Sequence, residues 1–334
     1  MDAYELLNRY IAGDRNFRGI NLPAANLIGA TLQRVDLTGS NLKEAALARA
    51  DLSRSFLLEA QLTGAFLYGT NMSYTKLKGS KLIEVDLTKA DLKGSNLSNV
   101  DLTGAKLSGA ILSWVTLYRA NMPGVNLCGA NLNGINLRSA NLTGANLNWT
   151  NLSGARLSGA CLKGAQMNEV KLNGAFLNGL NLEGANFSGI ELQAAKINGA
   201  KLQNSNFIGA NLAGAQMRLV NLEESNLKKA DLHNINLTNS QLNQAILMRA
   251  DLREADLRNA DLSGANLNLA NLSGANLSGA NLQGAYLWGA NLDGVNLSGA
   301  DLRGASLRDA IIIGANLHDA ILDGIIMPDG KICA

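Results

Sequence analysis

A large apolar side chain occupies every fifth position of this chain from Phe17 to Leu322, and the phase never slips. Of these 62 consecutive centres, 53 are Leu and the others are Met, Phe or Ile. A period of five matches neither the 3.6-residue period of an α-helix nor the two-residue period of a β-strand. A fixed short repeat of this kind predicts a solenoid, in which each repeat buries its apolar side by stacking on its neighbours.

The other positions of the five-residue unit are almost as regular. The residue two before each centre is small or β-branched, usually Ala, and the residue just before the centre is usually Asn or Asp. Gly is frequent two residues after the centre, where 33 of the chain's 35 glycines stand. Gly suits a turn that needs positive φ, and Asn or Asp side chains hydrogen-bond nearby backbone in turns. We therefore expect the centre and the small residue to point inward, and the other positions to form turns or face outward.

The unit A-(D/N)-L-(S/T/R)-G resembles that of the pentapeptide-repeat family. Segments 260–264 and 275–279 match this consensus letter for letter, and the resemblance covers about nine-tenths of the chain. It implies an all-β solenoid, a right-handed quadrilateral parallel β-helix of about 15 coils with four pentapeptides per coil. Leucine-rich repeats, with their period of about 20–29 residues, and calcium-binding β-rolls, with a nine-residue Gly-Asp repeat, fit the sequence worse.

Both ends of the chain depart from the repeat. We expect residues 1–14 to form an N-terminal α-helical cap, because Asp2 and Glu5 have the spacing of a capping box. The β-helix is expected to span 15–324, followed by a C-terminal tail over 325–334. The expected apolar face of the helix comprises Leu6, Leu7, Tyr10 and Ile11.

The terminal sequences also resemble those of cyanobacterial members of the family. These members begin with a similar helical segment and end on a pattern like that of Met327-Pro328-Asp329-Gly330. Gly13 is a natural stop for the helix. A solenoid benefits from such a cap, because its first coil otherwise exposes an apolar layer and unpaired strand edges.

Composition excludes several classes of protein. The net charge of +2 gives no overall field that would favour DNA or an anionic membrane. No run of eighteen apolar residues predicts a transmembrane helix, and the acidic amphipathic N-terminus lacks a signal pattern, so we expect a cytoplasmic protein with no membrane partner. Cys128, Cys161 and Cys333 are odd in number and have no motif spacing, which indicates incidental thiols.

The sequence contains no recognisable catalytic machinery. His233 and His318 lie 85 residues apart, and neither is expected to sit beside a second type of metal ligand. No nucleophile elbow, P-loop or dinucleotide-binding fingerprint stands apart from the repeat. The many Asp and Asn residues follow the period of the repeat, which assigns them to turns. We therefore expect no catalytic residue, no cofactor and no metal site, and a protein that is not an enzyme.

Four sides per coil place residues 20 apart in one column. The face that begins at Leu37 carries seven basic residues between positions 75 and 219 and no Asp or Glu. This is either an ordinary solvated face or a contact surface for an acidic partner. We call it the basic stripe, and it comprises Lys76, Lys78, Arg119, Arg138, Arg156, Phe176, Lys196 and Arg218.

A second group of outward positions near the C-terminus is apolar. Exposed apolar patches of this density usually mark contacts. We expect either a homodimer formed through this end or a monomer whose tail folds back over the patch. The candidate self-association residues are Tyr286, Trp288, Ile311, Ile313 and Ile326.

Three functions compete on these grounds. A non-catalytic protein-interaction scaffold with an unknown protein partner fits best, because uniform solenoids work through what their surfaces display. Some members of the resembled family mimic DNA and bind type II topoisomerases, but those members are acidic and dimerise through a C-terminal helix, whereas this chain is slightly basic. Direct nucleic-acid binding through the basic stripe is disfavoured, because seven charges with few interleaved aromatic rings are a thin interface.

Overall fold

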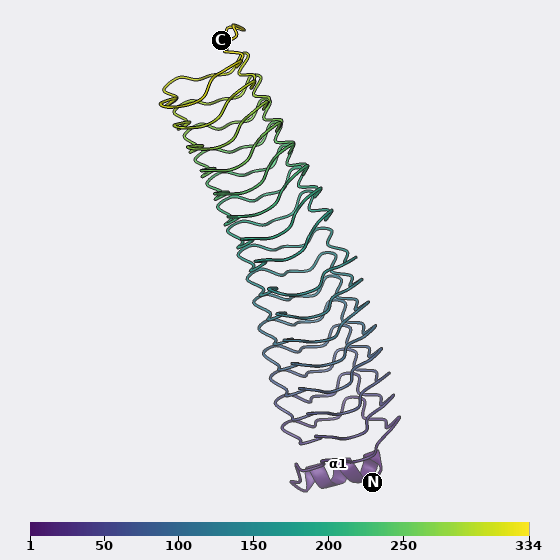
Figure 1. Cartoon of the computed structure of the whole chain (residues 1–334). Coiled ribbons are helices and arrows are strands. Elements are labelled where there is room, and N and C mark those ends of the chain that lie inside the picture. Colours follow the sequence, from purple (N-terminus) through teal and green to yellow (C-terminus); the bar gives the residue numbers. More distant parts are fainter. Residues whose placement is uncertain (334) are drawn as a thin grey trace. The chain divides into compact units, whose positions relative to one another are not determined.

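A computed structural model describes residues 1–333 of the chain. These residues form two compact units, 1–171 and 172–333. Within each unit the backbone is a stack of coils that turn every five residues, and α1 (Ala3–Ile11) precedes the first coil at the purple end of Figure 1. Among the described residues α1 is the one helix.

Parallel pairing joins residues that are 20 apart. In the first unit the pairs run from Asn16↔Asp36 to Asn151↔Lys171, and in the second from Phe176↔Lys196 to Ser306↔Ile326. Each side of a coil contributes a single bridging residue, so the sheets consist of isolated bridges rather than extended strands. One turn every five residues and one pairing step every 20 confirm a β-helix solenoid with four pentapeptides per coil.

One side of the first unit, from Asn141 to Ala145, shows how the repeat satisfies its backbone N–H groups. Asn141 donates to the preceding coil at 2.9 Å, while Leu142 and Gly144 donate to the following coil at 2.8 and 2.9 Å. Ala145 closes the turn on the Leu142 carbonyl at 3.0 Å. The remaining N–H, that of Thr143, donates to Oδ1 of Asn141 at 3.1 Å. Asn or Asp before the centre therefore supplies the one acceptor that the coils lack.

The turn two residues after each centre is left-handed throughout. All 62 of these positions, from Gly19 to Gly324, have φ between 52° and 73°; 33 are Gly and 29 are not. A positive φ at the second central residue, with an i to i+3 hydrogen bond, matches a type II turn. None of the 29 is β-branched. The stacked coils therefore impose the turn even where the side chain opposes it.

The core consists of the centres and the small residues, as the repeat predicts. Leu142 and Ala145 have no exposed surface, and the same holds for most residues in their phases. Phe187 and Phe207, 20 apart in the second unit, stack with ring centroids 5.1 Å apart. This contact confirms the column arithmetic. Where Ser replaces Ala, its hydroxyl is satisfied: Ser55 Oγ donates to the Leu32 carbonyl at 3.0 Å.

Both termini of α1 carry standard caps. Asp2 Oδ1 accepts a hydrogen bond from the Glu5 N–H at 2.8 Å, as expected for an N-cap. At the other end the Asp14 N–H donates to the Arg9 carbonyl at 2.9 Å, and Gly13 has φ of 106°. This is a Schellman motif, in which a left-handed Gly ends the helix.

The apolar face of α1 is narrower than the sequence predicts. Leu6 is fully buried, and Leu7 and Tyr10 are half-buried. Tyr10 Oη also donates to the Gln33 carbonyl at 3.2 Å, which ties the helix to the first coil. Ile11 is 81% exposed, so its place in the face was wrong. It is the last helical residue, and the chain turns away from it towards the coils.

The C-terminal tail folds back on the last coil. The parallel ladder continues to Ile326, which pairs with Ser306. The chain then reverses, and Ile326 also forms an antiparallel bridge with Ile332, supported by a Met327 N–H to Lys331 carbonyl bond of 2.8 Å. Ile326 is therefore half-buried and paired on both sides. The returning tail therefore covers Ile326 in part, and its role in self-association stays a prediction.

Candidate contact surfaces

In the first unit the basic stripe contributes five exposed cations, none of which is paired. Within residues 1–333, no carboxylate oxygen lies within the 4.0 Å ion-pair distance of any of them. Arg138 has a single weak partner, Asn136 Oδ1, at 3.3 Å from its Nε. Their charges are therefore directed to solvent. The five are Lys76, Lys78, Arg119, Arg138 and Arg156.

Three arginines elsewhere on the chain are neutralised by an aspartate two residues before them. Where Asp stands two residues before Arg, the guanidinium turns back onto that carboxylate at 2.6 to 2.7 Å. The Arg303 guanidinium lowers the pKa of Asp301 to about 2 through their hydrogen bond. Stripe residues Lys78 and Arg138 have Lys76 and Asn136 at this position instead. The three neutralised pairs are Asp251–Arg253, Asp256–Arg258 and Asp301–Arg303.

The rest of the basic stripe belongs to the second unit. Phe176 is half-buried, and Lys196 Nζ lies 4.7 Å from its ring centroid, a cation–π contact. Arg218 is exposed and lines a shallow cleft of about 260 Å³ together with Arg258. The stripe is therefore two sets of residues, one in each unit.

Four of the five candidate self-association residues remain exposed. Tyr286, Trp288 and Ile311 are each about half exposed, and Ile313 is 73% exposed. The Trp288 Nε1–H donates to Asp309 Oδ2 at 2.8 Å, which fixes the orientation of the indole. The returning tail pairs with Ile326 and leaves this apolar cluster open to solvent.

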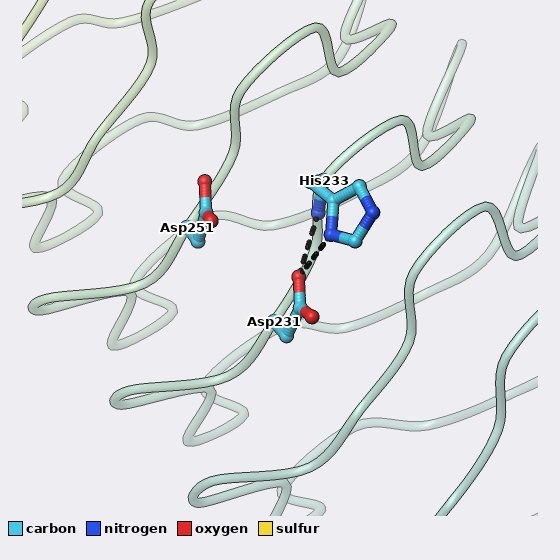
Figure 2. Close-up of side chains that lie close together, drawn as sticks. All are labelled: Asp231, His233 and Asp251. Atoms are coloured by element: carbon cyan, nitrogen blue, oxygen red, sulfur yellow. Dashed lines mark hydrogen bonds and ion pairs between the residues drawn. The ribbon is translucent and has the colours of Figure 1, made fainter.

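A group of three potential metal ligands lies on the second unit. Asp231 Oδ1 is 2.6 Å from His233 Nδ1, and one carboxylate oxygen of Asp251 lies within 4.8 Å of both (Figure 2). His318 likewise lies 2.9 Å from the carboxylate of Asp319. The expectation that both histidines stand apart from other ligand types was therefore wrong. The signal was present, since Asp231 precedes His233 by two residues and Asp251 by 20.

The Asp231–His233–Asp251 group could hold a divalent ion only at the expense of Arg253. Arg253 Nη2 lies 2.6 Å from Asp251 Oδ2, and its Nε lies 2.8 Å from Oδ1. The guanidinium thus engages both oxygens of that carboxylate, and it lowers the pKa of Asp251 by the same hydrogen bonds. A metal ion would have to displace a bidentate ion pair. The group is best described as a surface charge network.

The sequence reasoning missed one column of side chains. Arg34, Arg54, Tyr74 and Trp114 occupy turn positions at multiples of 20 residues, and all are exposed. Every residue was assigned to the face of its central Leu in the sequence analysis. Turn positions lie at the corners between two faces, so this grouping did not show them as a column. The 20-residue spacing would have revealed it. A cleft of about 300 Å³ opens along the column, lined by Gln33, Arg34, Ser53, Arg54, Ser73 and Tyr74.

Comparison with protein families agrees with this architecture. The family described as pentapeptide repeats matches much of the chain between residues 15 and 327. Among curated proteins, no sequence matches this chain. No helix of residues 1–333 has the length and apolar character needed to cross a membrane. The matched segments are 15–43, 40–79, 86–122, 95–134, 120–159, 150–189, 160–199, 185–223, 215–253, 250–289 and 290–327.

Solved structures of pentapeptide repeat proteins are similar to the chain. HetL of the cyanobacterium Nostoc sp. strain PCC 7120, involved in heterocyst differentiation regulation, is 29% identical over 100% of both chains, with a TM-score of 0.23. Rfr23 of the cyanobacterium Cyanothece 51142 is 23% identical over 51% of this chain and 100% of its own, with a TM-score of 0.27. QnrB1, a plasmid-mediated fluoroquinolone resistance protein, is 17% identical over 67% of this chain and 90% of its own, with a TM-score of 0.26.

Proposed function

Because the chain belongs to the pentapeptide repeat family, we propose that it is a non-catalytic scaffold for protein–protein interaction in the cytoplasm. Its coils hold the bridge and turn side chains at fixed intervals, about 4.8 Å from one coil to the next. Function in such repeat proteins depends on what these positions display. The displayed chemistry therefore indicates the partner.

The partner that fits the first unit is an acidic protein surface. The observation that carries this proposal is that all five first-unit cations of the basic stripe lack a carboxylate partner, whereas the arginines of Asp-Leu-Arg segments are paired. A cation that is already paired with a carboxylate contributes little to the binding of a second anion. Unpaired cations gathered on one face attract an acidic partner and repel basic ones.

Neutral side chains separate Lys76 and Arg156 within their bridge column. The bridge column that contains Lys76 and Arg156 continues through Asn96, Thr116 and Asn136, all neutral. The Asn side chains are engaged with the backbone two residues on, as in the Asn136 Oδ1 bond to the Arg138 N–H at 3.2 Å. They therefore act as spacers that keep the cations apart.

The proposal is tested by charge reversal with a matched control. In the stripe variant, Lys76, Arg138 and Arg156 become Glu. In the control variant, three exposed, unpaired cations of other faces become Glu, which gives the same net charge. These are Lys43, Arg49 and Lys163.

Both variants should fold normally, because exposed charges contribute little to stability. The measurement is quantitative pull-down from the native organism with the wild type and both variants as baits. We expect a partner that the wild type and the control retain and the stripe variant loses. If all three baits recover the same proteins in equal amounts, the stripe is an ordinary solvated face and the proposal is wrong.

DNA mimicry towards a type II topoisomerase is the weaker alternative, because a net charge of +2 opposes it. On the fold itself, we propose that the solenoid is right-handed with about 15 coils of four pentapeptides, as 62 repeats imply. We also propose that residues 1–14 act as a cap, 15–324 as the β-helix and 325–334 as a tail.

A further inference from the structure

The cleft along the Arg34 column combines two guanidinium groups with polar walls. Arg34 and Arg54 occupy the same turn position in successive coils, which places their backbones about 4.8 Å apart. Both side chains are exposed, and both line the 300 Å³ cleft with Ser53 and Tyr74. The cleft therefore brings two positively charged groups of hydrogen-bond donors close together.

Neither guanidinium is engaged within the described residues. Arg34 and Arg54 form no ion pair within 4.0 Å and donate no side-chain hydrogen bond in residues 1–333. The cleft of the second unit also holds two arginines, but there Arg258 Nη2 is 2.7 Å from Asp256 Oδ2. Of these two clefts, the Arg34–Arg54 cleft is the one that keeps both cations free for a ligand.

The backbone opposes arginine at these two positions. Arg34 and Arg54 have φ of 57° and 61°, in the left-handed region that Gly accepts without cost. Gly stands at 33 of the 62 equivalent turn positions. Arg34 and Arg54 nevertheless follow one another at this position in successive coils, which places two guanidinium groups side by side.

We propose that the Arg34–Arg54 cleft binds a phosphate anion, either free or as a monoester. A carboxylate has two oxygens, which one guanidinium fork satisfies. A phosphate monoester has three terminal oxygens and close to two negative charges near neutral pH, so two forks one coil apart can share it. The Tyr74 ring, one coil beyond Arg54, forms a wall for the group that carries the phosphate.

One carboxylate borders the cleft without cancelling its charge. Asp51 accepts hydrogen bonds from Gln33 Nε2 at 2.6 Å and from the Ser53 N–H at 2.9 Å. Burial raises the pKa of Asp51, but these hydrogen bonds outweigh burial and lower it overall. Asp51 therefore stays ionised, with its oxygens directed at Gln33 and Ser53, and the two arginines leave a net positive charge.

The test uses the full chain and three probes: inorganic phosphate, adenosine 5′-monophosphate and uncharged adenosine, titrated by calorimetry. Arg34→Gly and Arg54→Gly remove the guanidinium groups while suiting the left-handed turn, so both variants should fold. Arg49→Gly is the matched control, because Arg49 is exposed, unpaired and at φ of 58° on another corner of the same unit. Thermal melting checks the fold of each variant.

We expect phosphate to bind the wild type and Arg49→Gly equally, and each cleft variant about tenfold or more weakly, as for a lost charged hydrogen bond. Tighter binding of the nucleotide than of phosphate, lost in Tyr74→Gly, identifies the ester as the ligand. Equal binding of the two identifies free phosphate. The proposal is wrong if neither anion binds better than adenosine, or if Arg49→Gly weakens binding as much as the cleft variants. These variants do not touch the basic stripe, so the two proposals fail independently.

Discussion

The indole of Trp114 lies over Gly134, the residue one coil further on. A Cβ built on Gly134 would stand 2.6 Å from Cε3 of Trp114, closer than side chains approach. Tyr74 has the same relation to Gly94, where the distance to Cε1 is 2.7 Å. An aromatic ring that covers a Gly in the neighbouring strand protects its exposed backbone. Gly134 and Gly94 are thus constrained by a neighbouring ring as well as by positive φ.

Alanine substitution separates these two constraints. Gly134 and Gly124 have φ of 67° and 65°, but nothing lies within 4 Å of a Cβ on Gly124. Gly124→Ala should lower the free energy of unfolding by about 1–2 kcal/mol, because Ala is strained in the left-handed backbone conformation. Gly134→Ala should lower the free energy of unfolding further, because its methyl group must also displace the Trp114 ring.

Denaturant unfolding measures the two losses, and fluorescence follows the ring. Trp149 and Trp288 are first replaced by Phe, so that all indole emission comes from Trp114. Gly134→Ala should shift this emission to longer wavelength, as expected for a more exposed indole, and Gly124→Ala should not. Identical stabilities and spectra for the two variants would contradict the stacking of Trp114 on Gly134.

The buried centres should dominate stability. Leu142 has no exposed surface, so Leu142→Ala should cost roughly 2–5 kcal/mol through lost burial and a cavity. Leu142→Asp should cost more, because it buries a charge without a partner. Leu219 is the matched control: it stands at a turn, is 64% exposed, and Leu219→Ala should change the unfolding curve little. An unchanged melting curve for Leu142→Asp would refute the inward assignment of the centres.

The columns of the β-helix were predictable because the repeat contains no insertion. A constant spacing makes every 20th residue a neighbour, which is why the contact between Phe187 and Phe207 followed from counting alone. The backbone role of Asn and Asp also followed, because their period ties them to the turn. Arg34 and Arg54 obey the same arithmetic, but sorting by face centres overlooked the corners where turn positions lie.

Features at the chain ends were beyond such counting. Ile11 was placed on the buried face of the helix, but the last helical residue lies where the chain leaves for the coils. For Ile326 the sequence left open an exposed contact or cover by a returning tail, and the structure pairs it with Ile332 in that tail. Neither outcome depends on the repeat, because each is decided by how a unique segment packs on one coil. The hydrogen bond between Trp288 and Asp309 links one coil to the next. It depends on side-chain rotamers, which the repeat does not determine.

The N-terminal helix should prevent association of the first coil. Leu6 is fully buried, and Tyr10 is hydrogen-bonded to Gln33, so deleting residues 1–13 should expose apolar surface and unpaired backbone groups. We expect the truncated protein to associate and to melt at a lower temperature, as measured by light scattering and thermal unfolding. Asp2→Ala is the milder control, because loss of the N-cap should cost only about 1 kcal/mol. A truncated protein that stays monomeric with its melting temperature intact would exclude a capping role.

The second unit carries an exposed apolar cluster near its C-terminus that suits self-association. Tyr286, Trp288, Ile311 and Ile313 stay exposed although the tail folds back beside them. An apolar cluster of this kind is costly in water, and a two-fold contact between identical clusters is the simplest closed way to bury it. We therefore expect a homodimer whose population rises with concentration, measured by sedimentation velocity over a wide concentration range.

Two substitutions test this dimer independently. Ile313→Glu changes a side chain that is 73% exposed, and Trp288→Glu removes the indole held by Asp309. Both should give monomers with normal melting curves, although Trp288→Glu also sets a second carboxylate near Asp309, so Ile313→Glu is the cleaner test. Trp149→Glu, at a 63% exposed turn of the first unit, should leave the dimer intact. If the wild type sediments as a monomer at every concentration, the dimer is wrong, and pairing of the tail through Ile326 and Ile332 suffices to close this end.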